Sequence, residues 1–150
     1  MQLNDAVPSL QELEARFGAD TDALCSEHER LIEQILEEEE ELITGHRRHI
    51  DDGVDLVKQE MSLLNEVDKP GSDVESYVAS LDRLLTEKMT MITQMRKKLI
   101  DFHTHLKTEE AMSKLYQQQQ AAQDASVNPG DSNFADDLIM DNNNYDDGYF

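Results

Sequence analysis

The chain has 150 residues, of which 33 are acidic and 13 are basic, so its net charge at pH 7 is −20. Aromatic residues make up 5% and tryptophan is absent, while charged residues make up 31%. This composition is typical of long helices and not of a compact core built on large rings. A surface this negative repels nucleic acids and anionic membranes, so neither is expected as a partner.

The sequence lacks the motifs that mark several classes of function. The chain has no GxxxxGK[ST] or GxGxxG phosphate-binding loop and no recognisable nucleophile turn, so we expect no enzyme activity and no cofactor. His46 and His49 would share one face of a helix, but no repeated Glu-x-x-His pattern accompanies them, so no metal site is expected. Cys25 is the only cysteine, cannot form an internal disulfide and fits a reducing compartment. No apolar run approaches the ~20 residues of a membrane span, and no secretory signal peptide is expected.

Residues 1–20 are interpreted as a leader or linker. Within them, Ser9 can cap a short helix over residues 10–17 that ends at Gly18.

A first long helix is predicted over residues 21–67, with Thr21 or Asp22 as its N-cap. Its apolar residues recur at spacings of three and four in two adjoining rows, which indicates an apolar face wider than one partner helix covers. Five consecutive glutamates interrupt this pattern. They can be a solvated helical stretch or an acidic dock for a basic surface, and some of them must face the apolar side; they are Glu37, Glu38, Glu39, Glu40 and Glu41.

The helix is expected to stop in the turn at residues 68–72. Pro70 disfavours helix at the preceding residue and Gly71 permits a tight reversal. Ser72 has a glutamate three residues later, which is the spacing of a capping box. Because the stop, turn and restart fit within five residues, the two long helices are predicted to be antiparallel neighbours.

A second long helix is predicted over residues 73–119, and residues 117–123 can extend it or fray. Its heptad pattern places two rows in the seam between the helices, and through Leu106 ten of the eleven seam positions are apolar, with Lys88 as the exception. In an antiparallel arrangement Lys88 is expected near Asp52 and Gly53. One row is Val74, Leu81, Lys88, Met95, Phe102 and Glu109, and the other is Val78, Leu85, Ile92, Leu99, Leu106 and Ser113. The predicted fold class is therefore all-α, with two long helices in an antiparallel coiled-coil hairpin.

Residues 120–150 carry no basic side chain and are predicted to form a disordered acidic tail. Four apolar residues in this tail have two possible readings. They are scattered hydrophobic residues of a solubilising tail, or they form a short docking motif that orders on a partner; they are Phe134, Leu138, Ile139 and Met140.

Three stretches of the sequence are more specific than a generic coiled coil: EEEEELITGHRRHIDD (37–52), VKQEMSLLNEVDKPGS (57–72) and YVASLDRLLTEKMTMITQMRKKLIDFHTHLKTEEAMSK (77–114). They resemble the helical region that follows the motor domain in kinesin-13 proteins, which are microtubule-depolymerising kinesins. The similarity extends over roughly residues 27–114.

The resemblance implies a regulatory and dimerisation module that contacts a kinesin motor domain, or itself, at microtubules and spindles in the cytoplasm. The ATP-dependent motor is not in this chain, which can be a fragment or a stand-alone tail. A generic coiled-coil scaffold without a motor relationship is the alternative, and a helical-bundle enzyme or metal carrier is a third hypothesis that the absent metal spacing opposes.

Overall fold

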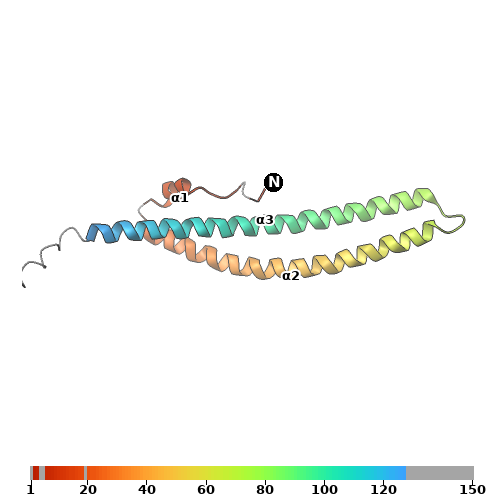
Figure 1. The fold of residues 1–150 in the computed structure, drawn as a ribbon, viewed down its shortest axis with the longest axis horizontal. Coiled ribbons are helices and arrows are strands. Elements are labelled where there is room, and N and C mark those ends of the chain that lie inside the picture. Colours follow the sequence, from red (N-terminus) through yellow and green to blue (C-terminus); the bar gives the residue numbers. More distant parts are fainter. Residues whose placement is uncertain (1, 4–5, 19, 128–150) are drawn as a thin grey trace, which may run out of the picture.

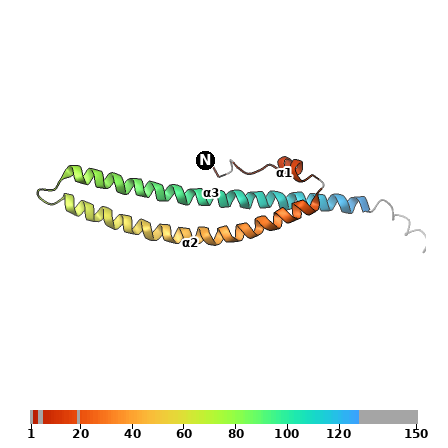
Figure 2. The ribbon, with the colours of Figure 1, turned by 180° about the vertical axis from the view of Figure 1, so that it is seen from behind.

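The computed structural model describes residues 2–3, 6–18 and 20–127, and the regular structure in these residues is all helical, as predicted. The helices are α1 (Leu10–Phe17), α2 (Thr21–Val67) and α3 (Val74–Val127). Both views of the ribbon show α2 and α3 side by side, with α1 lying along α3 near the start of α2 (Figures 1 and 2). At about 1.5 Å per residue, the two long helices extend for roughly 70 and 80 Å.

The short helix α1 begins as expected at Ser9. The Ser9 hydroxyl accepts a hydrogen bond from the backbone N–H of Glu12, and the Glu12 carboxylate accepts one from the backbone N–H of Ser9. This capping box fixes the start of a helix too short to be stable alone. Gly18 ends it with a φ of 50°, in the region that favours glycine.

Helix α2 is capped by Asp20, and not by the Thr21 or Asp22 that the sequence suggested. The Asp20 carboxylate accepts a 3.0 Å hydrogen bond from the backbone N–H of Ala23. Thr21 instead turns its hydroxyl toward α3 and donates to the side-chain oxygen of Gln119 at 3.1 Å. The cap therefore falls one residue earlier because the hydroxyl at the next position is used between helices.

The connection between the long helices contains Pro70, Gly71 and Ser72, and Gly71 has a φ of 80°. The capping box predicted from Ser72 is wrong. Its hydroxyl donates to the carbonyl of Val67 at 2.6 Å and so satisfies the end of α2. The start of α3 is served by Asp73, whose carboxylate accepts from the backbone N–H of Glu75 at 3.1 Å.

Helix α3 continues to Val127 and does not end at residue 119 as expected. The glutamine-rich stretch supports this extension, since Gln119 donates to the carbonyl of Gly18 at 2.6 Å and Gln120 to the Tyr116 hydroxyl at 3.0 Å. Residues 120–127, assigned above to the tail, are therefore helical. The remainder of that predicted tail, residues 128–150, lies outside the described residues.

Helices α2 and α3 run in opposite directions, because the residue number on α3 falls as the number on α2 rises at each cross-helix contact. Examples are Thr21–Gln119 (3.1 Å), His28–Glu109 (2.8 Å), Glu38–His105 (2.7 Å) and Glu60–Lys88 (2.6 Å).

The heptad register predicted for α3 is wrong in one of its two rows. The second predicted row faces solvent: Leu85 is 50% exposed and Ile92 is 52% exposed. The position before each of these residues turns inward instead, so Leu84 is 2% exposed and Met91 is half-buried. Val78, Leu99 and Leu106 of the second row are also exposed, whereas Ser113 at its end is half-buried. The first row is half-buried except for Val74, which is 62% exposed.

The buried core is concentrated at the α1 end of the molecule. One cluster of buried side chains joins all three helices there, while only Leu56 and Leu84 are buried in the half nearer the turn. The difference follows from the position of α1, which adds a third apolar surface to one half of the α2–α3 pair only. The cluster consists of Leu13, Leu24, Leu31, Ile35, Met112 and Leu115.

Candidate protein-interaction surfaces

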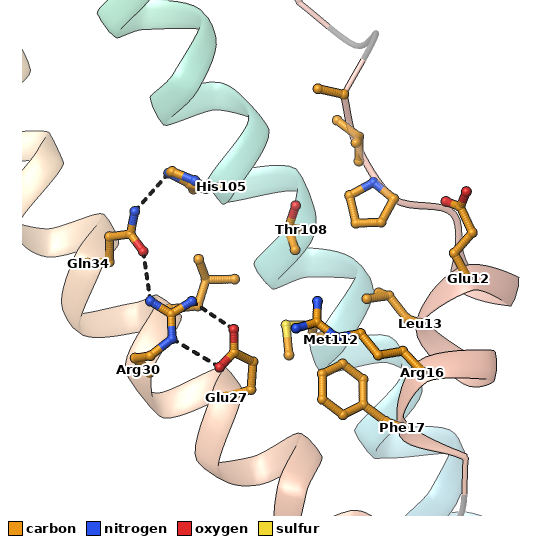
Figure 3. A pocket seen from close by; sticks show the side chains of 14 residues that line it. Glu12, Leu13, Arg16, Phe17, Glu27, Arg30, Gln34, His105, Thr108 and Met112 are labelled. Atoms are coloured by element: carbon orange, nitrogen blue, oxygen red, sulfur yellow. Dashed lines mark hydrogen bonds and ion pairs between the residues drawn. The ribbon is translucent and has the colours of Figure 1, made fainter.

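A groove of about 580 Å³ lies where α1 crosses the long helices (Figure 3). Leu13 and Phe17 of α1 turn toward Met112 of α3, and these side chains belong to or pack on the buried cluster. Because α1 already covers the apolar side of this groove, the groove is the place where the leader packs on the two long helices.

A chain of polar contacts crosses from α2 to α3 beside this groove. Arg30 donates two hydrogen bonds to the carboxylate of Glu27, at 2.7 and 3.0 Å, and one to the side-chain oxygen of Gln34 at 3.1 Å. These hydrogen bonds lower the pKa of Glu27 and raise that of Arg30. Gln34 in turn donates to Glu38 at 2.7 Å and lies 3.5 Å from His105 of α3.

The five glutamates predicted as an acidic dock divide into two groups. Glu38 is half-buried and faces α3, where its carboxylate lies 2.7 Å from Nδ1 of His105. The other four side chains are exposed; they are Glu37, Glu39, Glu40 and Glu41. The expectation that part of this run faces the partner helix is therefore met by one glutamate, and the remaining four present negative charge outward.

A polar groove of about 550 Å³ separates part of this acidic run from α3. Glu37, Glu40 and Glu41 line it on α2, together with Arg48, and Lys98 lines it on α3. Lys98 also lies 3.7 Å from the position that a Cβ would take at Gly45. Lys98 of α3 therefore approaches the acidic run of α2.

Lys88 contacts a different acid from the one predicted. Its ammonium donates to Glu60 at 2.6 Å, with both side chains partly buried, whereas Asp51 or Asp52 was the expected partner. Lys88 does share a groove with Gly53. The lysine stem is long enough to reach along α2 toward the turn, so proximity to one residue does not decide which carboxylate it selects.

An apolar face is exposed along both long helices, and it includes the apolar members of the second α3 row that the sequence-based register assigned to the interior of the hairpin. Large apolar side chains on both long helices are between 39% and 64% exposed. We call this set the open apolar face; on α2 it comprises Ile32, Leu36, Ile43, Ile50, Val54, Val57, Met61 and Leu64, and on α3 it comprises Val74, Val78, Leu85, Met89, Ile92, Leu99 and Leu106.

The two halves of the open apolar face lie on the same side of the molecule. A groove of about 470 Å³ is lined by Ile50, Val54 and Val57 from α2 and by Ile92 from α3, so it joins the two stripes near their middle. A contiguous apolar surface of this extent on a soluble protein marks an interaction site.

This face is opposite the one covered by α1. Arg30 and Gln34 of α2 line the groove beneath α1, whereas Ile32 and Leu36 are exposed. Residues two positions apart on a helix point about 200° apart, so α1 leaves the open apolar face uncovered.

The other predicted site residues have no contact that assigns them a function. Pro70, Gly71 and Ser72 form the turn, and the tail cluster Phe134, Leu138, Ile139 and Met140 lies outside the described residues. Among residues 2–3, 6–18 and 20–127, no three His, Cys, Asp or Glu side chains group as a metal site requires, and no helix is long and apolar enough to cross a membrane.

Two kinesin-like proteins are similar to part of this chain. The chain is 42% identical over 83 residues to the kinesin-like protein KIN-13A of Oryza sativa subsp. japonica, which covers 55% of the chain. It is 35% identical over 78 residues, or 52% of the chain, to the kinesin-like protein KIN-13B of Arabidopsis thaliana. The matched segment is 10% and 11% of the length of these two relatives.

No family model and no solved structure matches the chain. The similarity to the two kinesin-like proteins confirms the resemblance inferred from the sequence. Over about half of its length, this chain is similar to kinesin-13 proteins, and the small share of each relative that is matched is consistent with a non-motor region.

Proposed function

We propose that this chain is a regulatory and dimerisation module of a microtubule-depolymerising kinesin, and that it acts on microtubule depolymerisation and spindle dynamics through contact with the motor domain. In this proposal α2 and α3 form an antiparallel coiled-coil hairpin that presents two surfaces. The exposed glutamates of the acidic run contact the motor, and the open apolar face mediates self-association. The module works in the cytoplasm on the microtubule cytoskeleton.

The observation that carries the proposal is the 42% identity over 83 residues to a kinesin-like protein. The charge of the chain supports the choice of partner. A motor that binds the acidic microtubule lattice must offer it a basic face, and a surface with a net charge of −20 is complementary to that face. The same charge disfavours direct binding of this chain to the lattice.

The proposed mechanism is competition for the basic face of the motor. The module holds the motor in a closed state until tubulin displaces it, which requires the module to bind the closed state more tightly than the lattice-bound state. Glu37, Glu39, Glu40 and Glu41 are exposed on one segment of α2 and are available for this contact. Glu38 is excluded from it because it pairs with His105.

The test is the ATPase and microtubule-depolymerising activity of a purified kinesin-13 motor domain with and without this chain. Inhibition is expected for the native chain and is expected to weaken when the four exposed glutamates are changed to glutamine, with Glu38 retained so that the contact between the helices is preserved. The matched control removes four exposed charges near the turn, in the variant Glu66→Gln, Asp68→Asn, Glu75→Gln and Asp82→Asn.

Two outcomes would contradict the proposal. Robust co-sedimentation of the chain with microtubules at low and moderate salt, without a motor, would show direct lattice binding. A chain that leaves the motor unaffected at all concentrations would favour a coiled-coil scaffold without a motor relationship.

A further inference from the structure

The groove beneath α1 is only partly filled by that helix. Three apolar side chains on one face of α1 pack toward the buried cluster, namely Leu10, Leu13 and Phe17. Leu13 is 3% exposed, whereas the other two are half-buried. A volume of about 580 Å³ stays open beside them, with Leu31 and Met112 in its wall (Figure 3). The two long helices therefore offer more surface here than the eight residues of α1 cover.

The packing of α1 on the long helices is apolar. Across residues 2–3, 6–18 and 20–127, no hydrogen bond or ion pair joins a side chain of α1 to α2 or α3. The leader is tied down at its backbone instead: the carbonyl of Leu3 accepts from His103 at 2.9 Å, and that of Gly18 accepts from Gln119 at 2.6 Å. A helix of two turns is too short to be stable alone. Helix α1 can therefore leave the groove without breaking any side-chain hydrogen bond to α2 or α3.

The charge of α1 does not match the surface beneath it. Residues 20–38 and 102–119, which lie around the groove, contain 9 acidic and 3 basic side chains, a net charge of −6. Helix α1 itself carries two acids and one base, a net charge of −1. Like charges disfavour its docking, so the contact depends on the apolar side chains.

The one cation of α1 shows the sign that this surface prefers. The pKa of Glu27 is lowered mainly by the hydrogen bonds from Arg30, and the charge of Arg16 on α1 lowers it further. Arg16 and Glu27 both line the groove (Figure 3). A helix with more positive charges on its flanks would therefore be attracted where α1 as a whole is repelled.

We propose that this groove is a docking site for a basic amphipathic helix of a second protein, and that α1 is its displaceable occupant. The partner helix places apolar side chains at positions i, i+3 and i+7 against Leu31 and Met112, as α1 does, and carries lysine or arginine on its flanks. Binding of the partner releases the leader. The proposal goes beyond the motor contact proposed above and does not rest on it, because the glutamates of that contact line a different groove with Lys98.

Competition with α1 sets the affinity that the partner needs. Three residues, 18–20, connect α1 to α2, so its effective concentration at the groove is on the order of millimolar. A free helix with the same side chains does not displace α1 at micromolar concentration. Reversing the sign of the helix charge supplies the additional affinity, and this contribution is screened by salt because the Debye length is only about 10 Å at 0.1 M.

The first experiment uses a fluorescein-labelled peptide of residues 7–18 with blocked termini and the changes Gln11→Lys and Glu14→Lys. Both positions are exposed in α1, and Glu12 is kept so that the capping box is retained. These changes raise the net charge of the peptide from −1 to +2. The comparison peptide has the unchanged sequence. Binding is followed by fluorescence anisotropy with the full chain carrying Leu13→Ala, in which α1 is released from the groove.

We expect the lysine peptide to bind the Leu13→Ala chain about tenfold more tightly than the unchanged peptide at low salt. The ratio should fall toward one at high salt, because the attraction is screened. The native chain should bind the lysine peptide about tenfold more weakly than the Leu13→Ala chain, since α1 competes for the groove. Phe17→Ala serves as a second release variant, and helical circular dichroism is recorded for each chain.

The second experiment locates the peptide with two matched changes in the Leu13→Ala chain. Thr108 lines the groove, whereas Thr93 is exposed elsewhere on α3, and each hydroxyl donates to a carbonyl of its own helix at 2.8 Å. Thr108→Lys places a long cation in the groove and should weaken binding of the lysine peptide by about tenfold or more. Thr93→Lys changes the net charge equally and should leave the affinity within about twofold.

Each part of the proposal has an outcome that overturns it. No binding to the Leu13→Ala chain at millimolar peptide, or equal binding to the native and Leu13→Ala chains, would show that α1 does not occupy a docking site. Equal affinities of the two peptides at low salt would rule out the preference for a basic partner. Equal effects of Thr108→Lys and Thr93→Lys would place the peptide outside the groove. No motor is present in these assays, so motor inhibition can fail while the groove is confirmed.

Discussion

Leu84 and Leu85 are adjacent leucines that the structure places in opposite environments, at 2% and 50% exposure. Changing each to alanine therefore tests which row of α3 faces α2. Leu→Ala changes at buried sites cost about 2–5 kcal/mol, and we expect Leu84→Ala to cost about 2–3 kcal/mol because a seam between two helices is less enclosed than a globular core.

The matched change Leu85→Ala should cost much less. It removes three carbon atoms that are about half hydrated already, so at about 0.8 kcal/mol per buried methylene the loss is on the order of 1 kcal/mol. The higher helix propensity of alanine offsets part of that loss. The monomer should therefore be stabilised clearly more by Leu84 than by Leu85.

The assay is thermal unfolding followed by circular dichroism at 222 nm, at a protein concentration low enough for the chain to be monomeric. The expected fall in Tm is on the order of 10 °C for Leu84→Ala and a few degrees for Leu85→Ala, since about 1 kcal/mol corresponds to 4–8 °C in a domain of up to about 100 residues. Equal effects, or a larger effect at Leu85, would refute the register described here and restore the one predicted from the heptad pattern.

Three further changes follow from individual contacts. Gly71→Ala should lower the stability by about 1 kcal/mol in urea unfolding, because its φ of 80° is strained for alanine although a Cβ there meets no neighbouring atom. Leu13→Ala should release α1, which would be seen as faster tryptic cleavage within α1 while the circular dichroism of the long helices stays nearly unchanged. Hydrogen bonds from Lys107 and then Lys114 lower the pKa of Glu110 from 4.5 to about 2. Their contribution to the free energy of unfolding is therefore complete above about pH 4.5 and is lost as the pH falls through about 2. The fall in Tm over this pH range should be smaller for Glu110→Gln than for the native chain.

Local signals in the sequence predicted the features that depend on single residues. Ser9 capped α1 as expected, because a capping box needs only two side chains three positions apart. The choice between neighbouring polar residues was harder: Asp20 capped α2, and Ser72 bonded backward to Val67. Both outcomes depend on which groups remain unsatisfied after the helices have packed, and a linear pattern does not contain that information. The partner of Lys88 was missed for the same reason.

The surfaces proposed as sites were only partly visible in the sequence. The five glutamates were evident as a run, but the separation of Glu38 from its neighbours requires the position of His105 on the opposite helix. The width of the apolar face on α2 did indicate a second partner, and the exposed stripe that includes Ile50 and Val57 agrees with that indication. Which side of the hairpin stays open could not be predicted, because it depends on where α1 packs.

The error in the α3 register has a physical explanation that bears on function. The row containing Leu85, Ile92 and Leu99 is uniformly aliphatic, whereas of the positions before them Leu84 is buried, Met91 is half-buried and Lys98 is exposed. The heptad analysis selected the more apolar row for the seam, on the assumption that the strongest apolar signal marks the contact within one chain. The contact with α2 is instead made by a mixed row that includes polar cross-helix pairs. An aliphatic row that is left exposed on the hairpin is available for a contact between molecules, which is what the proposed self-association requires.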